Sequence, residues 1–185
     1  MKKTVLVFGS ISGAVISAMM FATLPFMDTI GFDRGEIIGY TSLVLAFLLI
    51  FFGVRSYRDN VAGGTVSFGR ALAVGALIAV VGSVFYVATW QVIYYKITPD
   101  FMVKYQAHEL EKARADGATE EAIAKKKADM DKFAVMYKNP AINAAITFVE
   151  PLPVGLVIAL VTAGVLSRRK KHVEGEMGVV AGARV

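Results

Sequence analysis

The chain has 185 residues, of which 56% are hydrophobic, and its formal net charge is +5. A soluble domain is usually about 45–50% apolar, so the composition indicates a membrane protein. The chain contains no cysteine, which excludes disulfides, a thiolate nucleophile and a cysteine-ligated metal site. The basic residues lie beside apolar segments, where membrane orientation explains them, so nucleic acid is not an expected partner.

Four stretches of the chain carry almost no charge: residues 4–27, 37–54, 71–95 and 141–167. A bilayer core of about 30 Å is crossed by roughly 20 apolar residues in a helix. We therefore predict an all-α integral membrane protein with four transmembrane helices. The membrane domain is expected to cover residues 1–171, and the remaining tail, 172–185, is expected to be mobile.

Basic residues gather at three places: before the first stretch, between the second and third, and after the fourth. They are Lys2, Lys3, Arg55, Arg58, Arg70 and the run at 168–171. Positive charge favours the cytoplasmic side, so we predict a bacterial inner-membrane protein with both termini in the cytoplasm. The long segment 97–139 then lies outside the cytoplasm, and Trp90, Tyr94 and Tyr95 form an aromatic belt at its edge.

Small residues recur every four positions in two of the apolar stretches. The first stretch has Gly9 and Gly13, and the third has Gly75 and Ala79, with Gly82 alongside. In lipid, helices associate through close backbone approach at small residues. We expect these five residues to form helix–helix contacts within one bundle.

The loop after the second stretch carries a charged cluster at the membrane edge, made of Arg55, Tyr57, Arg58 and Asp59. One interpretation is a contact with anionic lipid headgroups or with a partner protein. The other is orientation of the span together with local caps and turns, because Arg and Tyr are common at span ends.

Segment 97–139 has the pattern of a helical hairpin. The break is expected at Asp116 and Gly117, and Thr119 is expected to cap the second arm. That arm has apolar residues at helical spacing and ends at Asn139. The hairpin is interpreted either as a partner-binding arm or as a charged connector whose apolar stripe packs its two arms together.

Glu150 is the one carboxylate inside the fourth stretch, and Pro151 and Pro153 follow it. If the span begins near residue 141, Glu150 lies near the bilayer midplane, where a carboxylate is a functional candidate. If the span begins at Pro151, the two prolines occupy a first helical turn and Glu150 caps it at the interface. Residues 141–149 would then be an interfacial or re-entrant lead-in. Both interpretations remain open from the sequence.

Motifs for catalysis or metal binding are absent from the sequence. His108 and His172 are the only histidines, and the predicted topology places them on opposite sides of the membrane. No phosphate-binding loop or nucleophile elbow occurs. We expect no cofactor, no metal and no enzymatic activity.

Four sequence patterns in fixed order resemble the bacterial membrane-protein family called domain of unknown function 4199. They are EIIGYTSLVLAFLLIFFGVRSYRDN, GGTVSFGRALAVG, FYVATWQVIYYKITPDF and EPLPVGLVIALVTAGVLSRRKK. The resemblance covers residues 1–171 and implies a four-span inner-membrane protein. It implies no activity, cofactor or catalytic residue. The family's recurrent patterns fall here on Glu36, Gly39, Tyr40, Arg55, Ser56, Tyr57, Arg58, Asp59, Gly64, Phe68, Glu150, Pro151, Pro153 and Gly155.

Three hypotheses follow from the sequence. The first is a non-enzymatic accessory, assembly or partner-binding subunit whose partners are the bilayer and either another membrane protein or further copies of the chain. The second is a small oligomeric transporter or channel that uses Glu150 at a proline-broken fourth helix. The third, ranked last, is an enzyme acting on lipid at the Arg55–Arg58 cluster.

Overall fold

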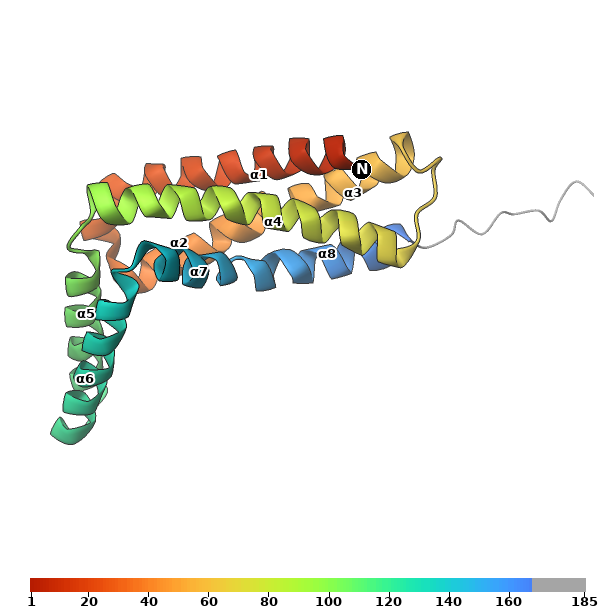
Figure 1. Cartoon of the computed structure of the whole chain (residues 1–185). Helices are drawn as coiled ribbons and strands as arrows, with labels where there is room; N and C mark the ends of the chain where they lie inside the picture. The colour runs from red at the N-terminus through yellow and green to blue at the C-terminus, as the bar shows by residue number, and fades with distance from the viewer. Residues whose placement is uncertain (168–185) are drawn as a thin grey trace, which may run out of the picture.

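A computed structural model describes residues 1–167, and its regular structure over that range is helical (Figure 1). The elements are α1 (Lys2–Thr23), η1 (Leu24–Phe26), α2 (Met27–Phe47), α3 (Leu49–Asn60), α4 (Phe68–Val92), η2 (Ile93–Ile97), α5 (Phe101–Ala115), α6 (Glu120–Tyr137), α7 (Pro140–Val149) and α8 (Leu152–Leu166). The all-α prediction is confirmed. The basic run at 168–171 and the predicted mobile tail, 172–185, lie outside the described residues.

Within the described residues, three helical stretches are long and apolar enough to cross a membrane, not the four that were predicted. They are Lys2–Asn60, Phe68–Ile97 and Pro140–Leu166. The difference arises because the expected loop at 28–36 is helical. A short 3₁₀ turn, η1, leads directly into α2. The backbone leaves helical geometry at Gly31, with φ 73° and ψ 169°, a conformation that suits glycine.

The first stretch folds back on itself. In Figure 1, α1 and the α2–α3 segment run in opposite directions along the bundle. Ser12 of α1 donates a 2.9 Å hydrogen bond to the carbonyl of Ala46 in α2. Farther along, a Cβ on Gly53 of α3 would lie 3.0 Å from the ring of Phe8 in α1. The 59-residue stretch therefore contains two antiparallel helical segments in contact.

Close backbone approach joins α1 to α4. A Cβ on Gly9 would lie 2.6 Å from Cβ of Val81, and one on Gly13 would lie 2.5 Å from Cβ of Phe85. Real Cβ atoms do not approach so closely, so the two helices touch at positions that only glycine fits. The contacts advance in the same direction along both helices, from Gly9 to Gly13 in α1 and from Val81 to Phe85 in α4, so the two helices run parallel.

On the other side of α4, α8 runs antiparallel. A Cβ on Gly75 would lie 2.8 Å from Cβ of Ala159, and one on Gly155 would lie 2.6 Å from Cβ of Ala79. Gly82 faces the ring of Phe47, which is fully buried. The helix-packing residues singled out in the sequence thus lie between helices of one bundle.

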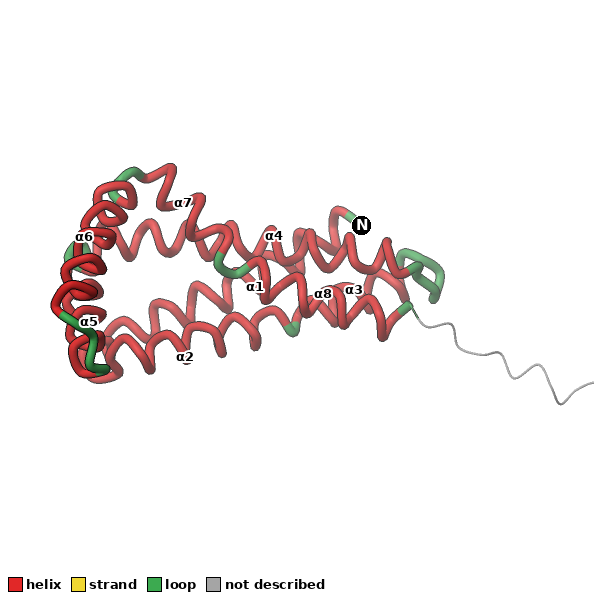
Figure 2. The backbone as a smooth tube through the Cα atoms, turned by 90° about the horizontal axis from the view of Figure 1, so that it is seen from below, coloured by secondary structure: helices red, strands yellow, loops and turns green. Residues whose placement is uncertain are grey.

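The predicted hairpin is formed by α5 and α6. Asp116 follows the last residue of α5, and Gly117 has φ 81°. The Thr119 hydroxyl accepts a 3.3 Å hydrogen bond from the amide of Ala122, which caps α6. Asn139 caps α7 in the same way. Figure 1 shows the hairpin turned across one end of the bundle, and Figure 2 shows both of its helices at that end.

The fourth predicted span is one helical stretch with a local break. In Figure 1, α7 and α8 follow one another along the bundle. Pro151 precedes α8 and Pro153 lies in its first turn, so a helix does begin there. Residues 141–149 are nevertheless helical and belong to the same apolar stretch as α8. The whole stretch, Pro140–Leu166, is long and apolar enough to cross a membrane, and the start of the span at Pro151 stays a prediction.

Candidate functional site at the hairpin end of the bundle

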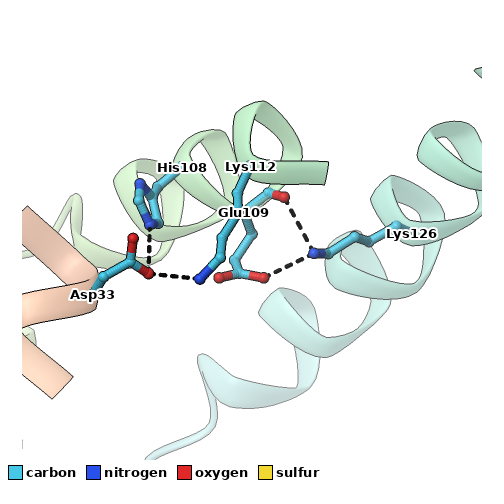
Figure 3. A network of polar contacts seen from close by, with 5 residues as sticks. All are labelled: Asp33, His108, Glu109, Lys112 and Lys126. Carbon is cyan, nitrogen blue, oxygen red and sulfur yellow. Dashed lines mark hydrogen bonds and ion pairs between the residues drawn. The ribbon is translucent and has the colours of Figure 1, made fainter. Parts of the chain in front are cut away.

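Two polar groups on α5 hold the hairpin against the start of α2 (Figure 3). Lys112 Nζ donates to Asp33 Oδ1 at 2.7 Å, and His108 Nε2 lies 3.4 Å from the same oxygen. The hydrogen bond with Asp33 raises the pKa of Lys112. Asp33 lies two residues beyond the break at Gly31, so the irregular backbone there places its carboxylate beside α5.

Phe32 reinforces this contact with an aromatic cluster. Its ring centroid lies 5.7 Å from Phe101, 5.6 Å from Tyr105 and 5.2 Å from the His108 imidazole. The first two pairs are edge-to-face, an arrangement that aromatic rings favour. The ion pair with Asp33 is exposed and contributes little alone, so apolar contact at Phe32 supplies much of the attachment.

The two arms of the hairpin are tied to each other by Lys126. Its ammonium donates to the Glu109 carboxylate at 2.8 Å and to the Glu109 backbone carbonyl at 3.1 Å. Nearby, Asp131 accepts from Lys127 and from Gln106, and these hydrogen bonds lower the pKa of Asp131. Leu110 and Ile123 are buried. The hairpin therefore has a small apolar core bordered by polar ties.

Tyr137, at the end of α6, makes the second attachment to the bundle. Its hydroxyl accepts a 2.9 Å hydrogen bond from Trp90 Nε1 and lies 3.1 Å from the Thr147 hydroxyl. Its ring lies 5.3 Å from that of Tyr94. Burial raises the pKa of Tyr137. One side chain thus joins α6, α4 and α7.

A buried polar network continues from Tyr137 between α4 and α7. Gln91 Nε2 donates to Asn143 Oδ1 at 2.7 Å, and the Thr147 hydroxyl donates to the same oxygen at 3.4 Å. Asn143 and Thr147 are almost fully buried. In residues 1–167, every buried side-chain nitrogen and oxygen has a hydrogen-bond partner. Satisfied polar groups in an apolar interior fix the relative position of two helices.

Glu150 lies between α7 and α8, roughly 15 Å along the helical stretch from Pro140. Tyr86 of α4 lies beside its carboxylate, and Glu36 of α2 is within electrostatic range. The side chain is exposed in the isolated chain. Pro151 cannot donate to the carbonyl of Thr147, so the backbone next to Glu150 has reduced hydrogen bonding.

The charged cluster at the end of α3 lies at the opposite end of the bundle from the hairpin (Figure 1). Arg58 Nε donates to Asp59 Oδ1 at 2.7 Å, and Arg55 lies 3.6 Å from the other oxygen. Tyr57 is buried in the core. The cluster is therefore internally paired, and its tyrosine takes part in packing.

Two sets of residues at the hairpin end were not predicted from the sequence. The first is Asp33 with its α5 partners, which lie 75 and 79 positions away and share no local pattern. The second is the network of Gln91, Asn143 and Thr147. Its signal was available, because Asn143 and Thr147 are polar residues at i and i+4 in an apolar stretch.

Within residues 1–167, no group of three or more His, Asp or Glu side chains is arranged to hold a metal ion. The arrangement offers instead an anchored hairpin, a buried polar network and one carboxylate at a helix break.

A family model described as Protein of unknown function (DUF4199) matches residues 7–168 of the chain. No curated protein and no solved structure matches the chain.

Proposed function

The chain belongs to the DUF4199 family, and we propose that it is a non-enzymatic membrane subunit that binds a partner protein through its hairpin. The observation that carries the proposal is the double anchoring of that hairpin. Asp33 and Phe32 hold α5, and Tyr137 holds α6. A connector needs no such attachment, whereas a docking element benefits from being held rigid.

Exposed apolar side chains on the hairpin support this role. Val103 is 70% exposed, Val135 is 71% exposed and Met136 is 44% exposed. Methionine is enriched in the buried centres of protein interfaces, and the rims of such interfaces are polar. The hairpin combines both kinds of surface on a fixed support.

We further propose that the bundle crosses a bacterial inner membrane four times, with both termini in the cytoplasm. A straight helix of 59 residues would be about 90 Å long, roughly three times a bilayer core. The antiparallel contact between Ser12 and Ala46 supports two crossings within that stretch instead. The hairpin then lies outside, on the side opposite Arg55 and Arg58.

Purification from native membranes in mild detergent tests the proposed role. We expect the wild-type chain to elute with a reproducible, stoichiometric partner. Asp33→Lys should weaken that association by loosening the hairpin, and the double change Asp33→Lys with Lys112→Asp should restore it. A chain that always elutes alone would contradict the proposal.

The alternative, a small oligomeric transporter or channel, is favoured by one observation. Glu150 lies at a proline-containing helix break beside Tyr86, with Glu36 nearby, and broken helices at membrane depth can line substrate sites. A proton or cation flux assay in proteoliposomes should then show a loss with Glu150→Gln but not with Glu121→Gln on the hairpin. Equal flux in both variants, or no flux at all, removes this alternative.

A further inference from the structure

Tyr137 marks the side of α6 that faces the bundle, and helical spacing identifies the other residues on that side. Tyr137 points into the bundle, where its hydroxyl meets Trp90. Side chains four, seven and eleven positions apart lie on one face of a helix. Phe133, Met130 and Lys126 therefore share the side of Tyr137. Figure 1 shows the hairpin extending beyond the bundle, so this side continues past the bundle's edge as an underside.

The same side of α5 is marked by Tyr105. Its ring contacts Phe32 of α2 at 5.6 Å between centroids. Glu109 lies one helical turn farther along α5 and pairs with Lys126 of α6. Both arms of the hairpin thus contribute side chains to the underside.

An open groove of about 600 Å³ lies between the arms and extends from this underside onto the adjoining flank of α6. Its volume is within the range of about 300–1,000 Å³ that is typical of small-ligand sites. Its lining includes two lysines, two acidic residues and two large apolar residues: Lys125, Lys126, Glu109, Asp129, Met130 and Phe133. The lining thus combines charges of both signs with apolar surface.

The two lysines of the groove differ in their ion pairing. Lys126 is bound to Glu109. In the described part of the chain, Lys125 forms no ion pair, and Asp129 has only Lys132 at 3.5 Å. Lys125 and Asp129 lie one helical turn apart on α6, so the groove presents an available cation next to an available carboxylate.

When the bundle crosses a bilayer, as proposed above, the underside of the hairpin lies at the level of the lipid headgroups. We propose that the groove binds the headgroup of a phosphatidylethanolamine lipid, and this inference rests on the proposed membrane crossing. Lys125 binds the phosphate, Asp129 accepts from the primary ammonium, and Met130 and Phe133 contact the glycerol and upper acyl carbons.

The chemistry of the lining selects this headgroup over two common alternatives. A choline headgroup carries a quaternary ammonium, which cannot donate a hydrogen bond to Asp129 or Glu109. A glycerol headgroup carries no cation, so it leaves the acids of the groove without a counter-charge. Charge-assisted hydrogen bonds are the stronger ones, so the ethanolamine ammonium is the best match.

Native mass spectrometry of the full-length chain in mild detergent tests the inference. Phosphatidylethanolamine, phosphatidylcholine and phosphatidylglycerol with identical acyl chains serve as probes. We expect a dissociation constant roughly tenfold lower for phosphatidylethanolamine than for the other two, since tenfold corresponds to one strong polar contact. Lys125→Gln and Asp129→Asn should each remove most of this preference.

Lys127→Gln is the matched control, because Lys127 is on the same helix, is exposed and does not line the groove. It should leave the preference within about twofold of wild type. Equal affinity for the three lipids, or an equal loss in Lys127→Gln and Lys125→Gln, would overturn the proposal. Partner co-purification and topology are measured separately, so failure of this site is distinguishable from failure of the proposed function.

Discussion

The bundle and the hairpin are held in place by different physical means. In the bundle, backbones approach so closely at Gly9, Gly13 and Gly75 that no larger residue fits without movement. At the hairpin, a few separate contacts, among them the aromatic cluster at Phe32 and the Trp90–Tyr137 hydrogen bond, join surfaces that are partly exposed. Changes in the bundle should therefore affect the stability of the whole protein, whereas changes at the hairpin should affect its attachment.

The largest effect is expected from Gly13→Ala. The new Cβ would lie 2.5 Å from Cβ of Phe85, so α1 and α4 must separate. Overpacking of this kind costs about 1–3 kcal/mol. Gly39→Ala is the control, because within residues 1–167 its added Cβ would have no neighbour within 4 Å apart from the adjoining residues and the backbone of its own helix. Thermal unfolding in detergent should show a lower midpoint for Gly13→Ala only. Equal midpoints for the two variants would contradict the close contact between α1 and α4.

A loss of comparable size is expected from Asn143→Leu. The change leaves Gln91 without its acceptor in the buried interface between α4 and α7. An unsatisfied buried polar group costs about 1–3 kcal/mol. The double variant with Gln91→Leu should recover part of the stability, because both polar groups are then gone. No recovery in the double variant would show that the two side chains act independently.

Tyr137→Phe tests the second attachment of the hairpin. It removes the hydrogen bonds to Trp90 and Thr147 but keeps the ring. We expect a loss of about 0.5–1.5 kcal/mol. Hydrogen exchange should quicken in α6 and α7 more than in α1. Uniform acceleration across the protein would indicate that Tyr137 supports the bundle as a whole.

The smallest effect on stability is expected from Asp33→Asn, because its ion pair with Lys112 is exposed. The unfolding midpoint should stay close to that of wild type, while limited proteolysis within residues 97–139 becomes faster. Asp131→Asn serves as a comparison, since its partners are within the hairpin. Equal cleavage of the two variants would argue against the attachment at Asp33.

The sequence predicted the elements whose signals are local. Thr119, Gly117 and Asn139 marked the ends of the hairpin helices correctly. The charges at 28–36 suggested a loop, but the chain remains helical there and changes direction at η1 and Gly31. Charged residues indicate where a chain meets water, but they do not indicate whether its backbone stays helical. Contacts such as Asp33 with Lys112 depend on the fold and have no local signature.

The central claim is that the first helical stretch crosses the membrane twice and places Asp28, Asp33 and the hairpin on one side. Because the chain has no cysteine, single cysteines at Asp28, Gly64 and Lys127 can be tested with a membrane-impermeant maleimide on intact spheroplasts. We expect labelling at positions 28 and 127 and protection at 64 until the membrane is opened. Labelling at position 64 together with position 127 would contradict this topology. Protection at position 28 while position 127 is labelled would contradict it as well.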